Sequence, residues 1–190
     1  MKAITVKQPW AYLICAGIKD VENRTWKTNY RGRILIHASG RAIPYHNFFD
    51  NFTEAQMESA NYFVYKKYDD YKDLTNAAII GSVEIVDCIK GYPSIWCNYD
   101  CWNWVLANPV LFETPILNMK GKLSFWESGY EEIVCPQCEK VCLHDHTTGF
   151  GADTTFGNYC HECEHCGYMI CESEWEDVNA NIINKLTKAL

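Results

Sequence analysis

Four of the eleven cysteines in this sequence stand in two Cys-x-x-Cys pairs near the end of the chain, Cys135–Cys138 and Cys163–Cys166. A two-residue spacer lets one tight turn aim two sulfurs at a single point, and four thiolates suit a tetrahedral Zn²⁺. Gly167, directly after the second pair, fits a turn that requires a positive φ. The sequence therefore predicts one structural zinc ion held by these four cysteines in a zinc ribbon.

Other chemistries for these cysteines are less well supported. An odd number of cysteines and the lack of a signal-peptide pattern argue against a disulfide framework, and no βαβ unit accompanies a redox motif. The ligand set stays open, because Cys160 forms a further Cys-x-x-Cys pair with Cys163. Six further residues could either form a second metal site or be ordinary surface and strand residues of the ribbon. They are Cys142, His144, His146, Cys160, His161 and Cys171.

Length and composition indicate one ordinary domain with a small appendage. The chain has 190 residues, of which 48% are hydrophobic and 14% aromatic, as in globular proteins. Its apolar runs are too short to span a bilayer, so no membrane partner is expected. The cysteine usage predicts a reducing, cytoplasmic location.

Charge is distributed unevenly along a chain whose net charge is −7. Residues 1–41 hold eight basic and two acidic residues, whereas residues 131–190 hold three basic and eleven acidic residues. This asymmetry favours a local anion site near the N-terminus over non-specific coating of a polyanion, although solvated surface charge is the simpler alternative.

The N-terminal segment that ends at Ser39 concentrates residues suited to nucleotide recognition. Lys19, Arg24 and Arg31 can neutralise phosphate or polarise a carbonyl group. Aromatic faces on which a base could stack are also present. The ligand-binding residues that this segment predicts are Gln8, Trp10, Lys19, Glu22, Arg24, Trp26, Arg31 and Ser39.

Glu22 has three possible roles among these cations. Its carboxylate can accept a hydrogen bond from a base amine, or it can pin Lys19 or Arg24 in place. A carboxylate and a lysine in one cleft can also perform acid–base catalysis. The residues alone leave these roles open.

The same segment resembles the ASCH domain, named for homology to activating signal cointegrator. Its QPW element is at 8–10, its G-x-K-x-x-E-x-R-x-W loop at 17–26 and its Y-R-G turn at 30–32, followed by an apolar strand. The resemblance extends over roughly residues 3–127 and implies an α+β fold. That fold is a small barrel like that of the pseudouridine-synthase-and-archaeosine-transglycosylase (PUA) domain, flanked by helices, with a cleft that binds RNA.

The resemblance also implies a rival activity. One bacterial branch of the family hydrolyses acetylcytidine with a lysine and a threonine of this loop and a distant glutamate. Lys19 matches the lysine, but Glu22 stands where the threonine would be. We therefore expect a protein that binds RNA or a modified nucleotide. The alternatives are an amidohydrolase or nuclease with Lys19 and Glu22 as catalytic residues, and a module that binds a protein partner through the acidic ribbon.

Sequence patterns also divide the chain into parts. We expect an ASCH domain over residues 1–130 with a helical insertion near 44–76, a zinc ribbon over 131–172 and an amphipathic helix over 173–190. Helices are predicted at Trp10–Ala16 and, after the capping box that begins at Thr53, to about Tyr71. The predicted strands are Ala3–Lys7, Arg33–His37, Ala78–Asp87, Trp102–Leu106, Val110–Ile116 and Gly121–Trp126.

Overall fold

The computed structural model describes residues 1–40, 52–67, 74–145, 160–171 and 174. The chain divides into two compact units, one of residues 2–128 and one of Met1 with the chain from Gly129 onward. The predicted C-terminal helix lies outside the described residues except for Glu174.

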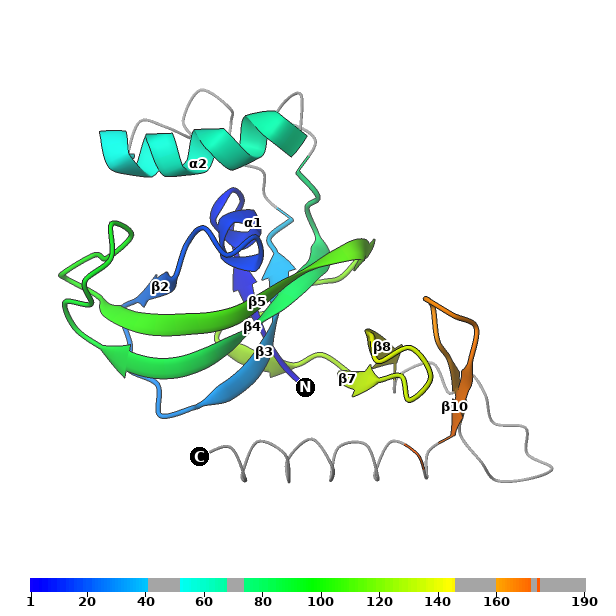
Figure 1. The fold of residues 1–190 in the computed structure, drawn as a ribbon. Coiled ribbons are helices and arrows are strands. Elements are labelled where there is room, and N and C mark those ends of the chain that lie inside the picture. The colour runs from blue at the N-terminus through cyan, green and yellow to red at the C-terminus, as the bar shows by residue number, and fades with distance from the viewer. Residues whose placement is uncertain (41–51, 68–73, 146–159, 172–173, 175–190) are drawn as a thin grey trace. The chain divides into compact units, whose positions relative to one another are not determined.

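The first unit is built on a curled six-stranded sheet (Figure 1). Its strands are β1 (Lys2–Val6), β2 (Val21–Arg24), β3 (Gly32–Ala38), β4 (Ala78–Ile89), β5 (Trp102–Ile116) and β6 (Phe125–Glu127). They lie in the order β2-β5-β4-β3-β1-β6, and only β1 and β3 run parallel. Because no pairing joins β2 to β6 among the described residues, the sheet is a half-barrel, compatible with a PUA-like fold.

Two helices accompany this sheet in the described part of the chain. The helix α1 (Trp10–Cys15) packs against β3, β4 and β5, with Ala11–Cys15 all buried. The helix α2 (Glu54–Lys67) lies on the other side of α1 from the sheet (Figure 1). The predicted capping box is present, because Thr53 and Gln56 exchange backbone-to-side-chain hydrogen bonds of 3.0 and 3.2 Å. Neither helix is long and apolar enough to cross a membrane.

The sequence predicts two strands separated by Asn108-Pro109, but the structure has one continuous strand there, β5. It continues through these residues because the register with β4 shifts beside them, which accommodates a proline that has no N–H to pair. Asn108 adopts a left-handed φ of 48°, which asparagine tolerates better than most residues. Its amide donates to Glu84 Oε2 at 2.8 Å, so the irregularity is anchored to the neighbouring strand.

The second unit contains two short hairpins. One pairs β7 (Tyr130–Val134) with β8 (Val141–Asp145), and the other pairs β9 (Cys160–Glu162) with β10 (Met169–Cys171). Among the described residues, its buried hydrophobic cluster consists of Ile133, Cys135, Cys142, Cys163 and Ile170. A cluster of this size supplies little stability by itself, so a crosslink between the hairpins would add substantially to it.

Gly81 on β4 allows α1 to lie directly on the sheet. A Cβ at this position would stand 2.2 Å from the Val110 carbonyl oxygen and 2.7 Å from Cys15 Sγ.

We expect Gly81→Ala to lower the free energy of unfolding by about 2 kcal/mol, because the backbone of the paired strand cannot move aside. Gly40→Ala is the control, since its Cβ would meet Ala77 at an ordinary 3.6 Å. Equal denaturation midpoints for the two variants would contradict this packing.

Candidate functional site

A cavity of about 550 Å³ opens on the side where the half-barrel does not close. Four separate stretches of chain line it, namely residues 5–10, 19–24, 39 and 121–124, with gaps within the first two. Five of the eight predicted ligand-binding residues are in this lining: Trp10, Lys19, Glu22, Arg24 and Ser39. The fold therefore gathers most of the predicted set at one place.

The strand β2 aims two of these side chains into the cavity. Glu22 and Arg24 are two residues apart on an edge strand that pairs with β5 opposite Trp104 and Trp102, so they project from the same face. The intervening Asn23 also reaches the lining, but its amide is used to hold the loop before β5, donating to Trp96 O at 2.9 Å. The E-x-R spacing in the sequence thus places both charged side chains on one face of a strand, because side chains alternate between the two faces.

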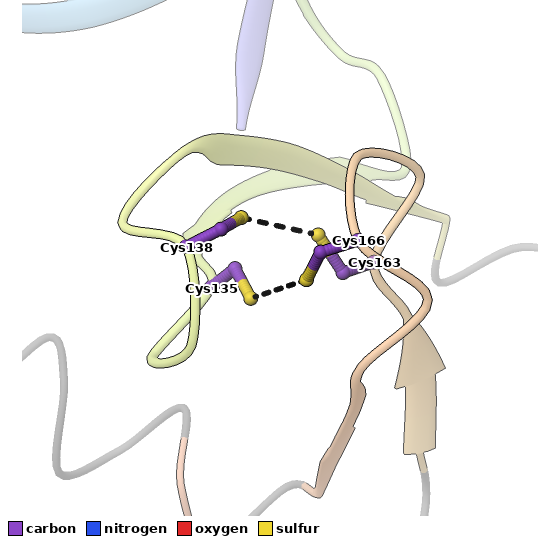
Figure 2. A group of neighbouring side chains, drawn as sticks. All are labelled: Cys135, Cys138, Cys163 and Cys166. Carbon is purple, nitrogen blue, oxygen red and sulfur yellow. Dashed lines mark hydrogen bonds between the residues drawn. The ribbon is translucent and has the colours of Figure 1, made fainter.

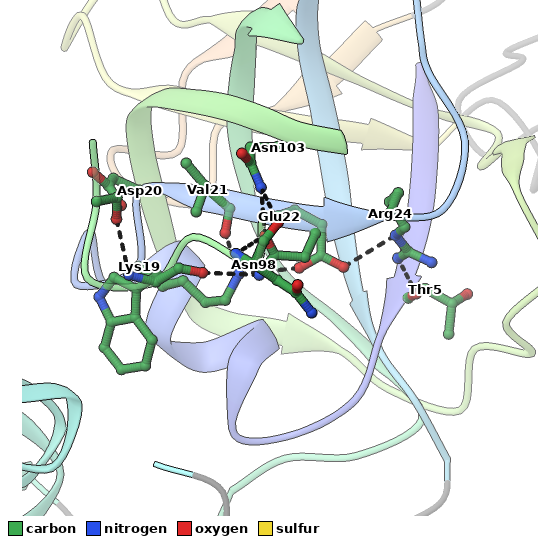
Figure 3. A network of polar contacts seen from close by, with 11 residues as sticks. Thr5, Lys19, Asp20, Val21, Glu22, Arg24, Asn98 and Asn103 are labelled. Atoms are coloured by element: carbon green, nitrogen blue, oxygen red, sulfur yellow. Dashed lines mark hydrogen bonds and ion pairs between the residues drawn. The ribbon is translucent and has the colours of Figure 1, made fainter. Parts of the chain in front are cut away.

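An ion-pair network crosses the open side of the half-barrel (Figure 3). Lys19 Nζ donates to the Val21 carbonyl and lies 3.3 Å from Glu22 Oε2. The other carboxylate oxygen, Oε1, lies 3.0 Å from Arg24 Nε, and Arg24 Nη2 donates to the Thr5 carbonyl at 2.9 Å. This network connects β2 to β1, which no backbone pairing joins.

Lys19 is unusually deep for a lysine, with a side chain only 3% exposed. Burial lowers the pKa of its ammonium group, and the Glu22 and Asp20 carboxylates raise it back in part. Because the unfolded chain holds this proton more tightly, the charged Lys19 lowers the free energy of unfolding at pH values below its pKa in the folded protein. This loss disappears as the pH rises toward the pKa of Lys19 in the unfolded chain.

The cavity lining is predominantly cationic. Lys7, Lys19, Arg24 and Lys122 contribute positive charge, and Glu22 is the single carboxylate among the lining residues. Since Glu22 already faces Lys19 and Arg24, the charges of Lys7 and Lys122 are left to attract an anion.

The wall at residues 121–124 is the part that sequence reasoning missed. Thr5 Oγ1 donates to the Lys122 carbonyl at 3.0 Å, and Lys122 Nζ lies 5.6 Å from the centre of the Trp126 ring. A Cβ on Gly121 would come within 2.6 Å of the His37 ring, so only glycine fits there. The sequence predicts a strand over Gly121–Trp126, but β6 begins only at Phe125, and the preceding residues form the wall of the cavity instead.

Three predicted residues lie outside this lining. Gln8 is 1% exposed, and its side-chain amide donates to Thr75 O at 2.8 Å and accepts from Tyr12 N at 3.0 Å. Trp26 packs edge-on against Trp104, with ring centres 4.6 Å apart. Arg31 lies on the surface.

Arg31 forms an ion pair with Asp87 at 2.7 Å. Hydrogen bonds to the Cys88 N–H and to Arg31 lower the pKa of that carboxyl group. The contacts of Gln8, Trp26 and Arg31 are those of scaffold residues, and their direct contact with a ligand stays a prediction.

The four cysteines of the two Cys-x-x-Cys pairs converge in the second unit (Figure 2). Their sulfurs all lie within 4.8 Å of one another, and Cys135–Cys166 and Cys138–Cys163 are each 3.7 Å apart. A tetrahedral zinc with Zn–S bonds of about 2.3 Å separates its sulfurs by about 3.8 Å. The cluster could therefore hold a metal ion, and its geometry is compatible with zinc.

The two cysteine turns have the same backbone design. Glu139 N donates to Cys135 O and Gly167 N to Cys163 O, at 2.9 and 2.8 Å. Both donor residues have left-handed φ values, 59° and 73°. Although burial raises the pKa of the Cys163 thiol, N–H groups of His165 and Cys166 donate to its sulfur, and the resulting pKa is about 6. This sulfur is therefore poised to ligate as a thiolate.

The candidates for a second metal site do not form a second cluster in the described part of the chain, where only the four-cysteine group brings three or more ligand atoms together. Cys142 is buried and donates to Cys163 Sγ at 3.4 Å. His144 and His161 approach each other with Nδ1 atoms 3.4 Å apart. His146 lies outside the described residues, as does the side chain of Cys160.

Comparison with known proteins agrees with the geometry of the first unit. The family model of the ASCH domain matches residues 4–116, more than half of the chain. The chain therefore belongs to the ASCH domain family.

Two relatives share this region. Activating signal cointegrator 1 of Mus musculus is 33% identical over 90 residues, and its Homo sapiens counterpart is 32% identical over 89 residues. Each match covers 46% of this chain and 14% of the relative. The chain thus spans only a small part of the length of these proteins.

The ion-pair network yields a stability prediction. Glu22→Ala should lower the free energy of unfolding by about 3 kcal/mol, because it leaves the buried Lys19 ammonium without its counterion. Adding Lys19→Met to this variant should recover part of the loss in chemical denaturation. Glu127→Ala breaks the exposed Lys2–Glu127 pair of 2.8 Å and should cost under about 1 kcal/mol. Equal losses from the two glutamate variants would show that burial does not matter here.

Proposed function

We propose that this protein binds single-stranded RNA through the cationic cavity of its ASCH domain. The observation that carries the proposal is a cavity of about 550 Å³ whose lining holds four cations and one carboxylate. Phosphate oxygens are the anions that such lysine and arginine groups bind in nucleic-acid complexes.

The form of the cavity favours a single strand over a duplex. Its volume is within the range of small-molecule sites, so it accommodates one nucleotide rather than the surface of a helix. Unpaired RNA exposes base faces and edges that a concave site can contact. Trp10 in the lining provides an aromatic surface next to the cations. Membership of the ASCH family agrees with a nucleic-acid ligand, as the sequence resemblance implies.

Lys122→Ala and Lys7→Ala should each weaken binding of a fluorescent RNA octamer by about 1–3 kcal/mol, because each removes a charge-assisted contact to phosphate. The salt dependence of the affinity should also become shallower, by about 0.7 in log–log slope for each lost contact. Lys27→Ala is the matched control, because Lys27 lies over Trp102, outside the cavity lining.

Fluorescence anisotropy over a series of salt concentrations provides both quantities. If Lys27→Ala weakened binding as much as Lys122→Ala, the RNA would be held by general surface charge. If none of the variants changed the affinity, the binding surface would lie elsewhere.

We further propose that the second unit is a zinc ribbon with one structural Zn²⁺ on Cys135, Cys138, Cys163 and Cys166. The sulfur separations support this assignment, and so does the small size of the hydrophobic cluster that the described residues of this unit form. Thiolate ligation needs reduced cysteines, in keeping with the expected cytoplasmic location. Binding of a protein partner by this acidic unit stays a prediction.

Metal analysis should return about one zinc per chain. Chelation should expose the region after residue 128 to protease and leave residues 2–128 resistant. Cys163→Ser should lose zinc, whereas Cys101→Ser should retain it, because Cys101 is outside the cluster. A metal-free protein whose second unit resists protease would refute the assignment.

A second candidate function is hydrolysis of a modified cytidine. It is favoured by a buried lysine of lowered pKa beside a carboxylate in a cavity. Against it, both oxygens of Glu22 already face cations. We therefore expect wild type and Glu22→Gln to release no cytidine from acetylcytidine in a mass-spectrometric assay. Turnover by the wild type that Glu22→Gln abolishes would establish an enzyme instead.

A further inference from the structure

A second cavity of about 390 Å³ adjoins the cationic one. The two share three lining residues, Trp10, Lys19 and Asn23. The remaining lining of the second cavity comes from the start of α2 and from the loop that precedes β5, neither of which reaches the first cavity. The shared residues therefore place the two cavities side by side.

The lining of the second cavity is aromatic rather than cationic. Phe52 lies between Trp10 and Trp96, with ring centres 6.3 and 5.5 Å away. Tyr99, also in the lining, is 75% exposed and so leaves much of its ring accessible. The only charged lining residues are Lys19, which Glu22 balances, and Asp100. Aromatic faces in a nearly neutral cavity suit a nucleobase, whereas the first cavity suits phosphate.

Polar groups with unused hydrogen-bonding capacity accompany these rings. Trp96 is 4% exposed, and its Nε1–H has no hydrogen-bond partner. The Asn98 side chain accepts from Asp100 N at 3.0 Å, but its Nδ2 donates to no described residue. The Asp100 carboxylate likewise has no partner in the described part of the chain. The exposed Asn98 amide and Asp100 carboxylate thus give the cavity N–H donors and one strong acceptor, the complement of a base edge.

The loop that carries these groups is held rigidly by Asn103, which is fully buried. The Asn103 amide donates to Asn23 Oδ1 and Asn98 O, at 2.9 and 3.1 Å. Its Oδ1 accepts from Tyr92 N and from Cys97 Sγ, at 3.1 and 3.2 Å. All four hydrogen-bonding positions of this side chain are therefore used, which preforms the second cavity and reduces the ordering cost of binding.

We propose that the second cavity binds the base of a nucleotide whose phosphate lies in the cationic cavity. This inference rests on the proposed RNA binding and adds a direction to it, with the base toward Tyr99 and the phosphate toward Lys122. Asp100 then selects bases that carry an exocyclic amine, because a carboxylate accepts from an amine and is repelled by a carbonyl oxygen. Cytosine satisfies both the acceptor and the N–H donors, whereas uracil presents a carbonyl in place of the amine.

The test compares three fluorescent RNA octamers of equal charge, namely oligocytidylate, oligouridylate and an octamer without bases. Wild-type protein should bind oligocytidylate more tightly than the other two. Tyr99→Ala should weaken oligocytidylate binding by about tenfold, as expected for loss of one stacked base, and leave the abasic octamer unaffected. Asp100→Asn should reduce the preference for cytosine over uracil. Ile95→Ala is the control, since Ile95 is in the same loop, 49% exposed and outside the lining.

The outcomes separate the two proposals. If all three octamers bound equally and Tyr99→Ala changed none of them, the base site would be refuted while cationic RNA binding stood. If none of the octamers bound at all, the proposed function and the base site would fail together. Equal binding of oligocytidylate and oligouridylate by the wild type would refute the role of Asp100.

Discussion

The open side of the half-barrel is the constraint on which the binding region depends. The strands β2 and β1 are not paired with each other, so side chains must join them across this opening. Arg24 does this by donating to the Thr5 carbonyl while Glu22 holds it from the other side. Closing the barrel with backbone hydrogen bonds would remove the cavity. A buried ion-pair network instead joins the strands and leaves room for a ligand.

This arrangement divides the charges of the cavity into two kinds. Lys19 and Arg24 share the carboxylate of Glu22, so their charges mainly maintain the site. Lys7 and Lys122 line the same cavity away from that network and can be neutralised by a ligand. A buried pair contributes little net stability but fixes geometry, since removal of one partner leaves a costly buried charge. The network is therefore better understood as a positioning device than as a source of stability.

The second unit has a different physical basis. Within the part that the structure describes, its two hairpins bury a small cluster of side chains, and two cysteine turns of matching backbone design face each other. A metal ion in that position would link the hairpins and supply most of the folding energy of the unit. The two units would then respond differently to a chelator, because the first one has its own hydrophobic core.

The sequence by itself determined what local spacing can encode. The cysteine pairs, the capping box at Thr53 and the ASCH motif all depend on residues a few positions apart, so the sequence alone displays each of them. Only the tertiary structure decided which motif residues face the cavity, because hydrogen bonding and packing hold Gln8 and Trp26 in the scaffold. It also brought Lys122 beside Thr5, 117 positions away in the chain. Such pairings follow from sheet order and burial, which no short spacing of residues specifies.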